Sequence, residues 1–207
     1  KNRPAGISRV WAALLKELAK TDLAKNIVLL DRDGCSPHIA GIARRLIKGY
    51  DYQHFEPDSL YLQTICEEEN AAVFISTYYT YPENTNSVIM LHDMIPEIKG
   101  QDLMHPEWRA KARAIDKACA YFCVSQSTMN DFRKLYPQYA DRKIYLTPNA
   151  VSEQFCLHTE EEIGRFKSKY GIRKPYFLFV GRRMLYKNAI LFFRAFSLLE
   201  NKNDFEI

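Results

Sequence analysis

The chain has 207 residues, of which 47% are hydrophobic and 26% are charged, and its formal net charge is +4 at pH 7. This apolar content predicts a globular core, and the mild charge without a long Lys/Arg block argues against nucleic acid as a partner. No apolar run approaches 18 residues and no signal peptide is visible, which disfavours a membrane span or secretion. Five cysteines without zinc spacing are expected to be reduced thiols of a cytoplasmic protein.

Apolar periodicity predicts an amphipathic helix over residues 6–20. Short apolar runs predict strands over residues 27–30, 71–76, 87–91, 120–124, 143–146 and 176–180, with a further strand starting at 205. Helical patterns predict helices over residues 57–70, 106–119, 125–136, 160–170 and 188–200. The segment 35–55 is ambiguous, and it favours a helix near residues 39–47 and a strand near residues 52–55.

Strands that alternate with helices predict an α/β fold, with a Rossmann-like parallel sheet and helices on both faces. Residues 1–150 are expected to form one such domain. Its first strand is expected to be missing, because a helix comes first and the chain starts without methionine. Residues 151–174 form a linker region in this interpretation. Residues 175–207 begin a second domain and are too few to close a core of their own.

Ligands of parallel α/β sheets bind beyond the carboxyl ends of the strands. The loops there contain His92-Asp93 after residue 91, Ser125 after residue 124 and Asn149 after residue 146. A histidine at such a position can hydrogen-bond a ligand in either protonation state near pH 7, or it can merely cap the strand. Ser125 (or Ser127) is equally an N-cap of the following helix, and Asn149 is equally a turn residue.

Two basic segments predict an anion site. Gly181 ends an apolar run, Arg182 and Arg183 follow it, and Lys187 stands at the start of a helix, so backbone N–H groups and fixed cations could hold a diphosphate. The residues 6–9 open the first helix, where Gly6 permits close approach of a ligand and Arg9 adds charge. The alternative for each segment is a solvated helix start or turn.

Two further groups of side chains leave two interpretations open. The aromatic residues Tyr78, Tyr79 and Tyr81 could stack on a sugar ring or pack beneath their loop. The basic residues of the helix near 106–119 could face a membrane surface or form a solvated face; they are Arg109, Lys111 and Arg113. No Gly-x-Ser-x-Gly sequence surrounds Ser125, so a hydrolase nucleophile is not indicated.

Five short motifs in order resemble the GT-B glycosyltransferases of the large retaining group 1 (family 4). They are Gly-Ile-x-Arg from residue 6, His-Asp-x-Ile-Pro from residue 92, Val-Ser-x-Ser-Thr from residue 124, Pro-Asn-Ala-Val from residue 148, and Phe-Val-Gly-Arg-Arg with a later Lys-Asn from residue 179. The resemblance implies two Rossmann-like domains, an N-terminal one for the acceptor and a C-terminal one for a nucleotide-sugar donor. This chain would hold the N-terminal domain and the start of the second.

The resemblance also implies roles for individual residues. Arg182 and Lys187 would bind the donor diphosphate, with Arg183 beside them at a position where the family varies. Gly6 would approach the diphosphate from the other domain, and His92 would hydrogen-bond the transferred sugar near the reacting carbon. The remaining candidates for substrate binding are Arg9, Asp93, Ser125 and Asn149.

The implied reaction is transfer of a sugar from a nucleoside diphosphate to a glycan or lipid-linked acceptor with retention, as in polysaccharide biosynthesis. The family attributes retention to attack on the leaving-group face, so it needs no protein nucleophile, and neither metal nor cofactor is indicated. The family's downstream glutamate pair lies beyond residue 207, so we expect no meaningful turnover by these 207 residues. Three alternatives stay open: a non-catalytic sugar- or nucleotide-binding module, an epimerase and a phosphorylase. The implied location is cytoplasmic, with contact at the inner face of the membrane if the acceptor is lipid-linked; the oligomeric state is not indicated.

Overall fold

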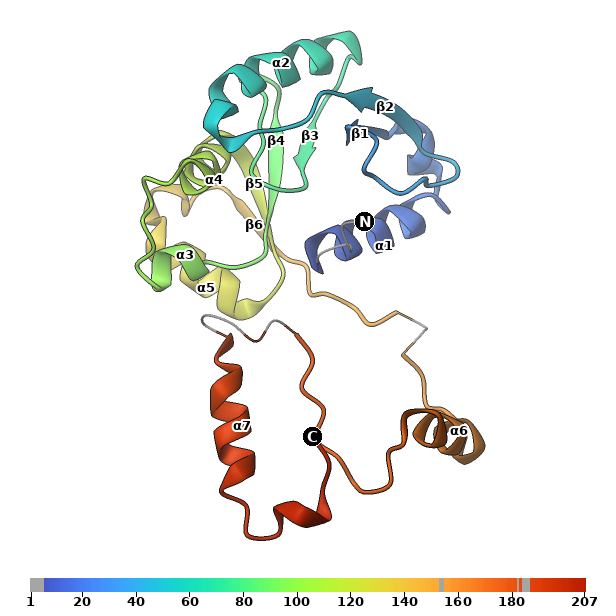
Figure 1. Cartoon of the computed structure of the whole chain (residues 1–207). Coiled ribbons are helices and arrows are strands. Elements are labelled where there is room, and N and C mark those ends of the chain that lie inside the picture. The colour runs from blue at the N-terminus through green and yellow to red at the C-terminus, as the bar shows by residue number, and fades with distance from the viewer. Residues whose placement is uncertain (1–5, 153–154, 182, 184–186) are drawn as a thin grey trace. The chain divides into compact units, whose positions relative to one another are not determined.

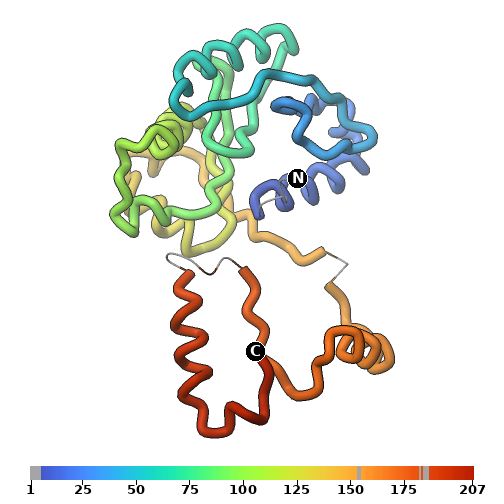
Figure 2. Tube along the Cα trace, in the orientation of Figure 1, coloured from blue at the N-terminus to red at the C-terminus, as the bar shows by residue number. Residues whose placement is uncertain are grey.

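The computed structural model describes residues 6–152, 155–181, 183 and 187–207. The chain divides into two compact units, Lys1–Ser152 and Glu153–Ile207, and each is described by itself (Figures 1 and 2). The first unit is α/β, with parallel sheets flanked by helices, an arrangement compatible with a Rossmann-like fold. No helix among the described residues is both long and apolar enough to cross a membrane.

The elements of the first unit follow the predicted alternation. Its helices are α1 (Gly6–Leu18), α2 (Phe55–Glu68), α3 (Ile95–Ile98), α4 (Pro106–Lys117) and α5 (Gln126–Leu135), with short 3-10 helices at Asp22–Asn26, Tyr52–His54 and Pro137–Tyr139. Its strands are β1 (Val28–Arg32), β2 (Ala43–Ile47), β3 (Phe74–Ser76), β4 (Ser87–Leu91), β5 (Ala118–Cys123) and β6 (Lys143–Leu146).

The strands form two separate parallel sheets. One contains four strands in the order β3-β4-β5-β6, with Leu91 opposite Cys123 and Cys123 opposite Leu146. The other is the pair β1-β2. Because all four strands of the larger sheet are parallel, the loops after β3, β4, β5 and β6 leave from one edge. This edge is where the sequence predicted a binding site.

The main core lies between the four-stranded sheet and the helices α4 and α5 (Figure 1). Its fully buried members include Ile115 of α4, Tyr121 of β5 and Phe132 of α5. A smaller cluster joins α2 to both sheets, since Leu62 and Ile65 pack with Ile47 of β2 and Phe74 of β3. Helix α2 therefore holds together two groups of strands that share no strand ladder in the described structure.

Two predictions for residues 35–55 were wrong. The expected helix near residues 39–47 is a coil followed by strand β2, and the expected strand near residues 52–55 is a 3-10 helix that leads into α2. Strand β2 forms because it pairs with β1 along its length, from Ala43 opposite Val28 to Ile47 opposite Arg32. Pairing with a neighbour decides the conformation of such a short segment more than its own apolar spacing does.

The second unit contains α6 (Glu160–Tyr170), α7 (Ala189–Ser197) and a 3-10 helix at Lys202–Asp204. Helix α6 has the predicted bounds. It begins with a capping box between Thr159 and Glu162, and its C-cap Gly171 is in the left-handed conformation. The predicted strand over residues 176–180 is absent. Among the described residues, an isolated parallel bridge joins Tyr176 to Glu206, and residues 177–180 belong to no strand.

Candidate functional site

The carboxyl edge of the four-stranded sheet gathers the candidate residues of the first unit. Trp11 of α1 donates from Nε1 to the carbonyl oxygen of Thr77, 3.1 Å away in the loop after β3. This bond ties the N-terminal half of α1 to the edge. The loop after β4 meets the first turn of α5 where the Thr128 hydroxyl lies 3.4 Å from the carbonyl oxygen of His92. Four segments that are distant in sequence therefore converge on the same region.

His92 follows the last residue of β4 and is half-buried. Its Nε2 atom is buried and has no hydrogen-bond partner among the described residues. Burial lowers the pKa of His92, although the neighbouring Asp93 carboxylate acts in the opposite direction. A neutral imidazole carries one donor and one acceptor nitrogen, and a buried polar atom without a partner is a place where water or a ligand completes the bonding.

Asp93 is engaged with its own loop. Its Oδ1 atom accepts a hydrogen bond of 3.0 Å from the backbone N–H of Ile95, which starts α3. Its main-chain carbonyl oxygen accepts a hydrogen bond of 3.1 Å from the ammonium group of Lys111. Contact of Asp93 with a substrate stays a prediction.

Ser125 is the N-cap of α5, as one of the two interpretations predicted. Its Oγ atom accepts a hydrogen bond of 3.0 Å from the backbone N–H of Thr128 and lies 2.9 Å from the Thr128 hydroxyl. Asn149 is exposed in the segment after β6. Substrate contact by either residue stays a prediction.

Gly6 is the first residue of α1, and Gly6 and Arg9 are both exposed. A Cβ atom built on Gly6 would meet no atom within 4 Å. The described structure therefore leaves open space at this helix start, which is compatible with close approach of a ligand. It offers no internal packing reason for a glycine there.

The basic residues that were predicted to bind a diphosphate precede α7 in the second unit. Gly181 has φ = 133°, a conformation that L side chains rarely adopt, so the turn after the apolar run depends on glycine. Arg182 lies outside the described residues. The guanidinium of Arg183 lies 5.7 Å from the ring centroid of Phe193, and Lys187 is exposed just before α7 begins at Ala189. A site shared by these cations and His92 stays a prediction.

The tyrosines of the loop after β3 favour packing over stacking on a sugar. Tyr79 and Tyr81 are buried in the main core, and Tyr78 stacks on Tyr79 with ring centroids 3.9 Å apart. The Tyr78 hydroxyl donates to Glu107 at 2.9 Å. Burial is the largest cause that raises the pKa of each of these phenols.

The basic residues of α4 do not share one face. Lys111 is buried, with its side chain 1% exposed, whereas Arg109 and Arg113 are exposed. The burial of Lys111 was not predicted from the sequence. It could have been, because Lys111 has the helical spacing of the buried residues Ala114 and Ile115 (i+3 and i+4). A positive charge at a core position of an amphipathic helix was the available signal.

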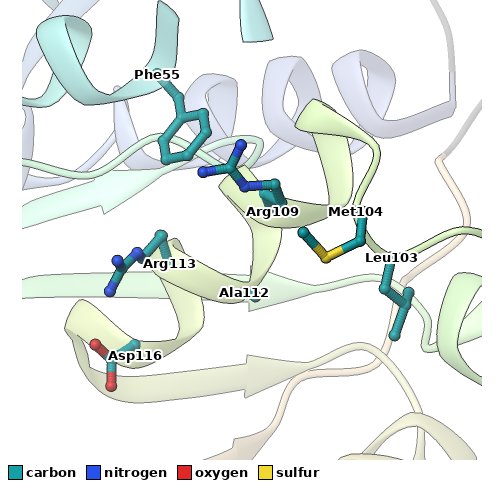
Figure 3. A pocket seen from close by; sticks show the side chains of 7 residues that line it. All are labelled: Phe55, Leu103, Met104, Arg109, Ala112, Arg113 and Asp116. Atoms are coloured by element: carbon teal, nitrogen blue, oxygen red, sulfur yellow. The ribbon is translucent and has the colours of Figure 1, made fainter. Parts of the chain in front are cut away.

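A pocket of about 390 Å³ lies on the exposed side of α4 (Figure 3). Its lining residues are Phe55, Leu103, Met104, Arg109, Ala112, Arg113 and Asp116. None of them belongs to the loops that leave the carboxyl edge of the sheet. The chemistry of the histidine loop, rather than this pocket, defines the candidate site.

No group of three or more His, Cys, Asp or Glu side chains in the described part of the chain is arranged to hold a metal ion. In the comparisons with known proteins, neither a protein-family model nor a curated protein matches the chain. Its function is therefore argued from its residues and their geometry.

Proposed function

We propose that the chain is part of a GT-B glycosyltransferase that moves a sugar from a nucleoside-diphosphate donor to a glycan or lipid-linked acceptor with retention. The observation that carries this proposal is His92. It stands at the carboxyl end of a central parallel strand, with a buried Nε2 atom that lacks a partner in the described structure. A hydroxyl group of a bound sugar could complete this nitrogen's bonding.

The division of the strands also supports a doubly wound architecture. In Rossmann-like sheets the first strand is central, and the strand order reverses beside it. Here β1 and β2 form one group and β3 to β6 the other, with α2 packed against both. Two groups of strands bridged by one helix fit such a reversal of strand order.

The roles that follow are positioning and charge stabilisation rather than covalent chemistry. Arg182 and Lys187 hold the diphosphate and stabilise charge on the leaving nucleoside diphosphate, with Arg183 beside them. His92 orients the transferred sugar and contacts it near the reacting carbon. In this proposal, a phosphate oxygen of the donor assists deprotonation of the acceptor, so retention requires no protein nucleophile.

The test compares each nucleotide with its sugar-bearing form. Affinities of UDP, GDP and their hexose conjugates are measured by calorimetry for the protein and for two variants. Lys187→Ala should weaken nucleotide and nucleotide sugar alike by about 1–3 kcal/mol, because it removes a charge-assisted contact to phosphate. His92→Ala should weaken the nucleotide sugar alone.

Lys169→Ala serves as the control, since Lys169 is another exposed lysine of the second unit. It should leave all affinities unchanged. Equal affinities in Lys187→Ala and the parent protein would remove Lys187 from the site. Binding of nucleotide without any preference for a sugar conjugate, unaffected by His92→Ala, would favour a non-catalytic nucleotide-binding module.

A further inference from the structure

Lys111 of α4 forms a buried ion pair that the proposed function does not use. Its ammonium nitrogen lies 2.8 Å from Glu97 Oε2, and the side chains of Lys111 and Glu97 are 1% and 7% exposed. The hydroxyl of Tyr136 donates to the other carboxylate oxygen of Glu97 at 3.1 Å. A buried ion pair is a weak means of stabilising a fold, because desolvation offsets much of its attraction. The pair therefore calls for another explanation.

The ammonium group also contacts two loops at the carboxyl edge of the sheet. It donates at 3.1 Å to the main-chain carbonyl oxygen of Asp93, in the loop after β4. It lies 5.8 Å from the ring centroid of Tyr79, in the loop after β3. Tyr79 has φ = 52°, an unusual conformation for a bulky residue, which persists only where the surroundings enforce it.

Two successive peptide planes that follow His92 are held by side chains from different helices. The carbonyl oxygen of His92 accepts from the Thr128 hydroxyl of α5 at 3.4 Å, and that of Asp93 accepts from Lys111 of α4 at 3.1 Å. Together these anchors restrict the His92–Asp93 and Asp93–Met94 peptide planes, the first of which adjoins the Cα atom of His92. The orientation of the imidazole depends on that backbone.

We propose that Lys111, with its charge balanced by Glu97, is a positioning residue that fixes the His92 loop and so presents the imidazole in one orientation. This inference rests on the proposed role of His92 in binding the transferred sugar. An apolar side chain at position 111 could fill the same space, but it could not donate to the Asp93 carbonyl. The role of the ammonium group is therefore to donate this hydrogen bond to the loop.

The test uses the double variant Lys111→Met/Glu97→Gln in the 207-residue chain. It removes both charges together, and the glutamine oxygen can still accept from Tyr136, so the fold should survive. The imidazole of His92 is followed by ¹⁵N NMR, with His92→Gln used to assign its signals. One sharp set of imidazole signals is expected in the parent protein, and shifted, doubled or broadened signals in the double variant.

The second readout is the preference for a nucleotide sugar over the free nucleotide, taken from the affinities described above. This preference should fall by about threefold to tenfold in the double variant, which corresponds to one weakened hydrogen bond. Two controls should leave both readouts unchanged. Arg113→Met changes an exposed cation of the same helix, and Tyr136→Phe removes the hydroxyl that donates to Glu97 but keeps the bond from Lys111 to the loop.

Unchanged His92 signals in a folded double variant would overturn the proposal, and so would an equal disturbance in Tyr136→Phe. If the double variant does not fold, Lys111→Arg carries the test, because it keeps the charge but moves the donors; the same change in the His92 signals is expected. If the parent protein shows no preference for any nucleotide sugar, the proposed function fails, while the NMR signals of the ligand-free protein still decide whether Lys111 positions His92.

Discussion

Replacing Asp31 with asparagine should destabilise the first unit by about 2–3 kcal/mol at pH 7. The carboxylate is fully buried in β1, where one oxygen accepts from the backbone N–H of Ser36 at 2.7 Å and the other from Arg44 Nε at 2.6 Å. Asparagine can keep the first bond, but its amide group would turn donors toward a guanidinium. Breaking a buried ion pair costs about 3–5 kcal/mol. We expect the smaller loss of about 2–3 kcal/mol here because the Arg44 side chain remains 36% exposed, so solvent screens the pair.

Urea unfolding followed by tryptophan fluorescence measures this loss. Both tryptophans, Trp11 and Trp108, lie in the first unit, so the signal reports on the unit that contains Asp31. With a slope of about 2 kcal/mol per molar urea, the midpoint should fall by about 1–1.5 M. The control is Asp22→Asn, which removes an exposed carboxylate and should change the midpoint little.

A second check is the pH dependence of the difference in unfolding free energy between Asp31→Asn and the parent protein. Burial by itself would raise the pKa of Asp31, but the hydrogen bonds from Ser36 and Arg44 outweigh it and lower the pKa. A lowered pKa contributes stability that is present above about pH 4 and is lost as the pH falls through the folded-state value. The gap between Asp31→Asn and the parent protein should therefore shrink in acid. A gap that stays constant from pH 7 to pH 3, or one below about 0.5 kcal/mol at pH 7, would refute this reasoning.

Two further predictions concern the candidate site. Burial lowers the pKa of His92, although Asp93 acts in the opposite direction, so an NMR titration of His92 should give a pKa below about 6.5. The contribution of the neutral ring to the free energy of unfolding should be lost as the pH falls through the folded-state pKa. A pKa at or above the ordinary value would contradict the burial of the ring. Ser125→Ala should cost about 1 kcal/mol of unfolding free energy, because Ser125 caps α5; Ser127→Ala on the exposed first turn should cost much less, and equal losses in urea titrations would argue against a cap at Ser125.

Local signals made most of the first unit predictable. The run at residues 87–91 became β4 with the predicted bounds, and the hydroxyl residues at 125–128 marked the start of α5. Strand β2 was missed because its residues are mostly exposed, and its charged side chains pair with acidic partners on other elements: Arg44 with Asp31, and Arg45 with Glu68 and Glu69. Such long-range pairing leaves little trace in apolar spacing.

The candidate site was predictable only where a local signal in the sequence marked it. A histidine after a strand is visible in a sequence, so His92 was identified from its position. The partner that holds its loop was not, because Lys111 was grouped with other cations by residue type rather than by its place in the helical period. The run from residue 176 shows that apolar character alone does not make a strand. An apolar segment becomes a strand only beside a partner, and among the described residues only Glu206 bridges to this run.

The separation of β1-β2 from the larger sheet gives the first unit two levels of local stability. Strand hydrogen bonds make β3 to β6 one cooperative group, whereas the described contacts of the pair with that sheet run through side chains beneath α2. Contacts of this kind allow partial opening at a lower free energy than global unfolding. The pair can therefore loosen together with Leu15 and Ala19 at the C-terminal end of α1, while Trp11 stays bonded to the loop after β3 and the loop that carries His92 keeps its shape.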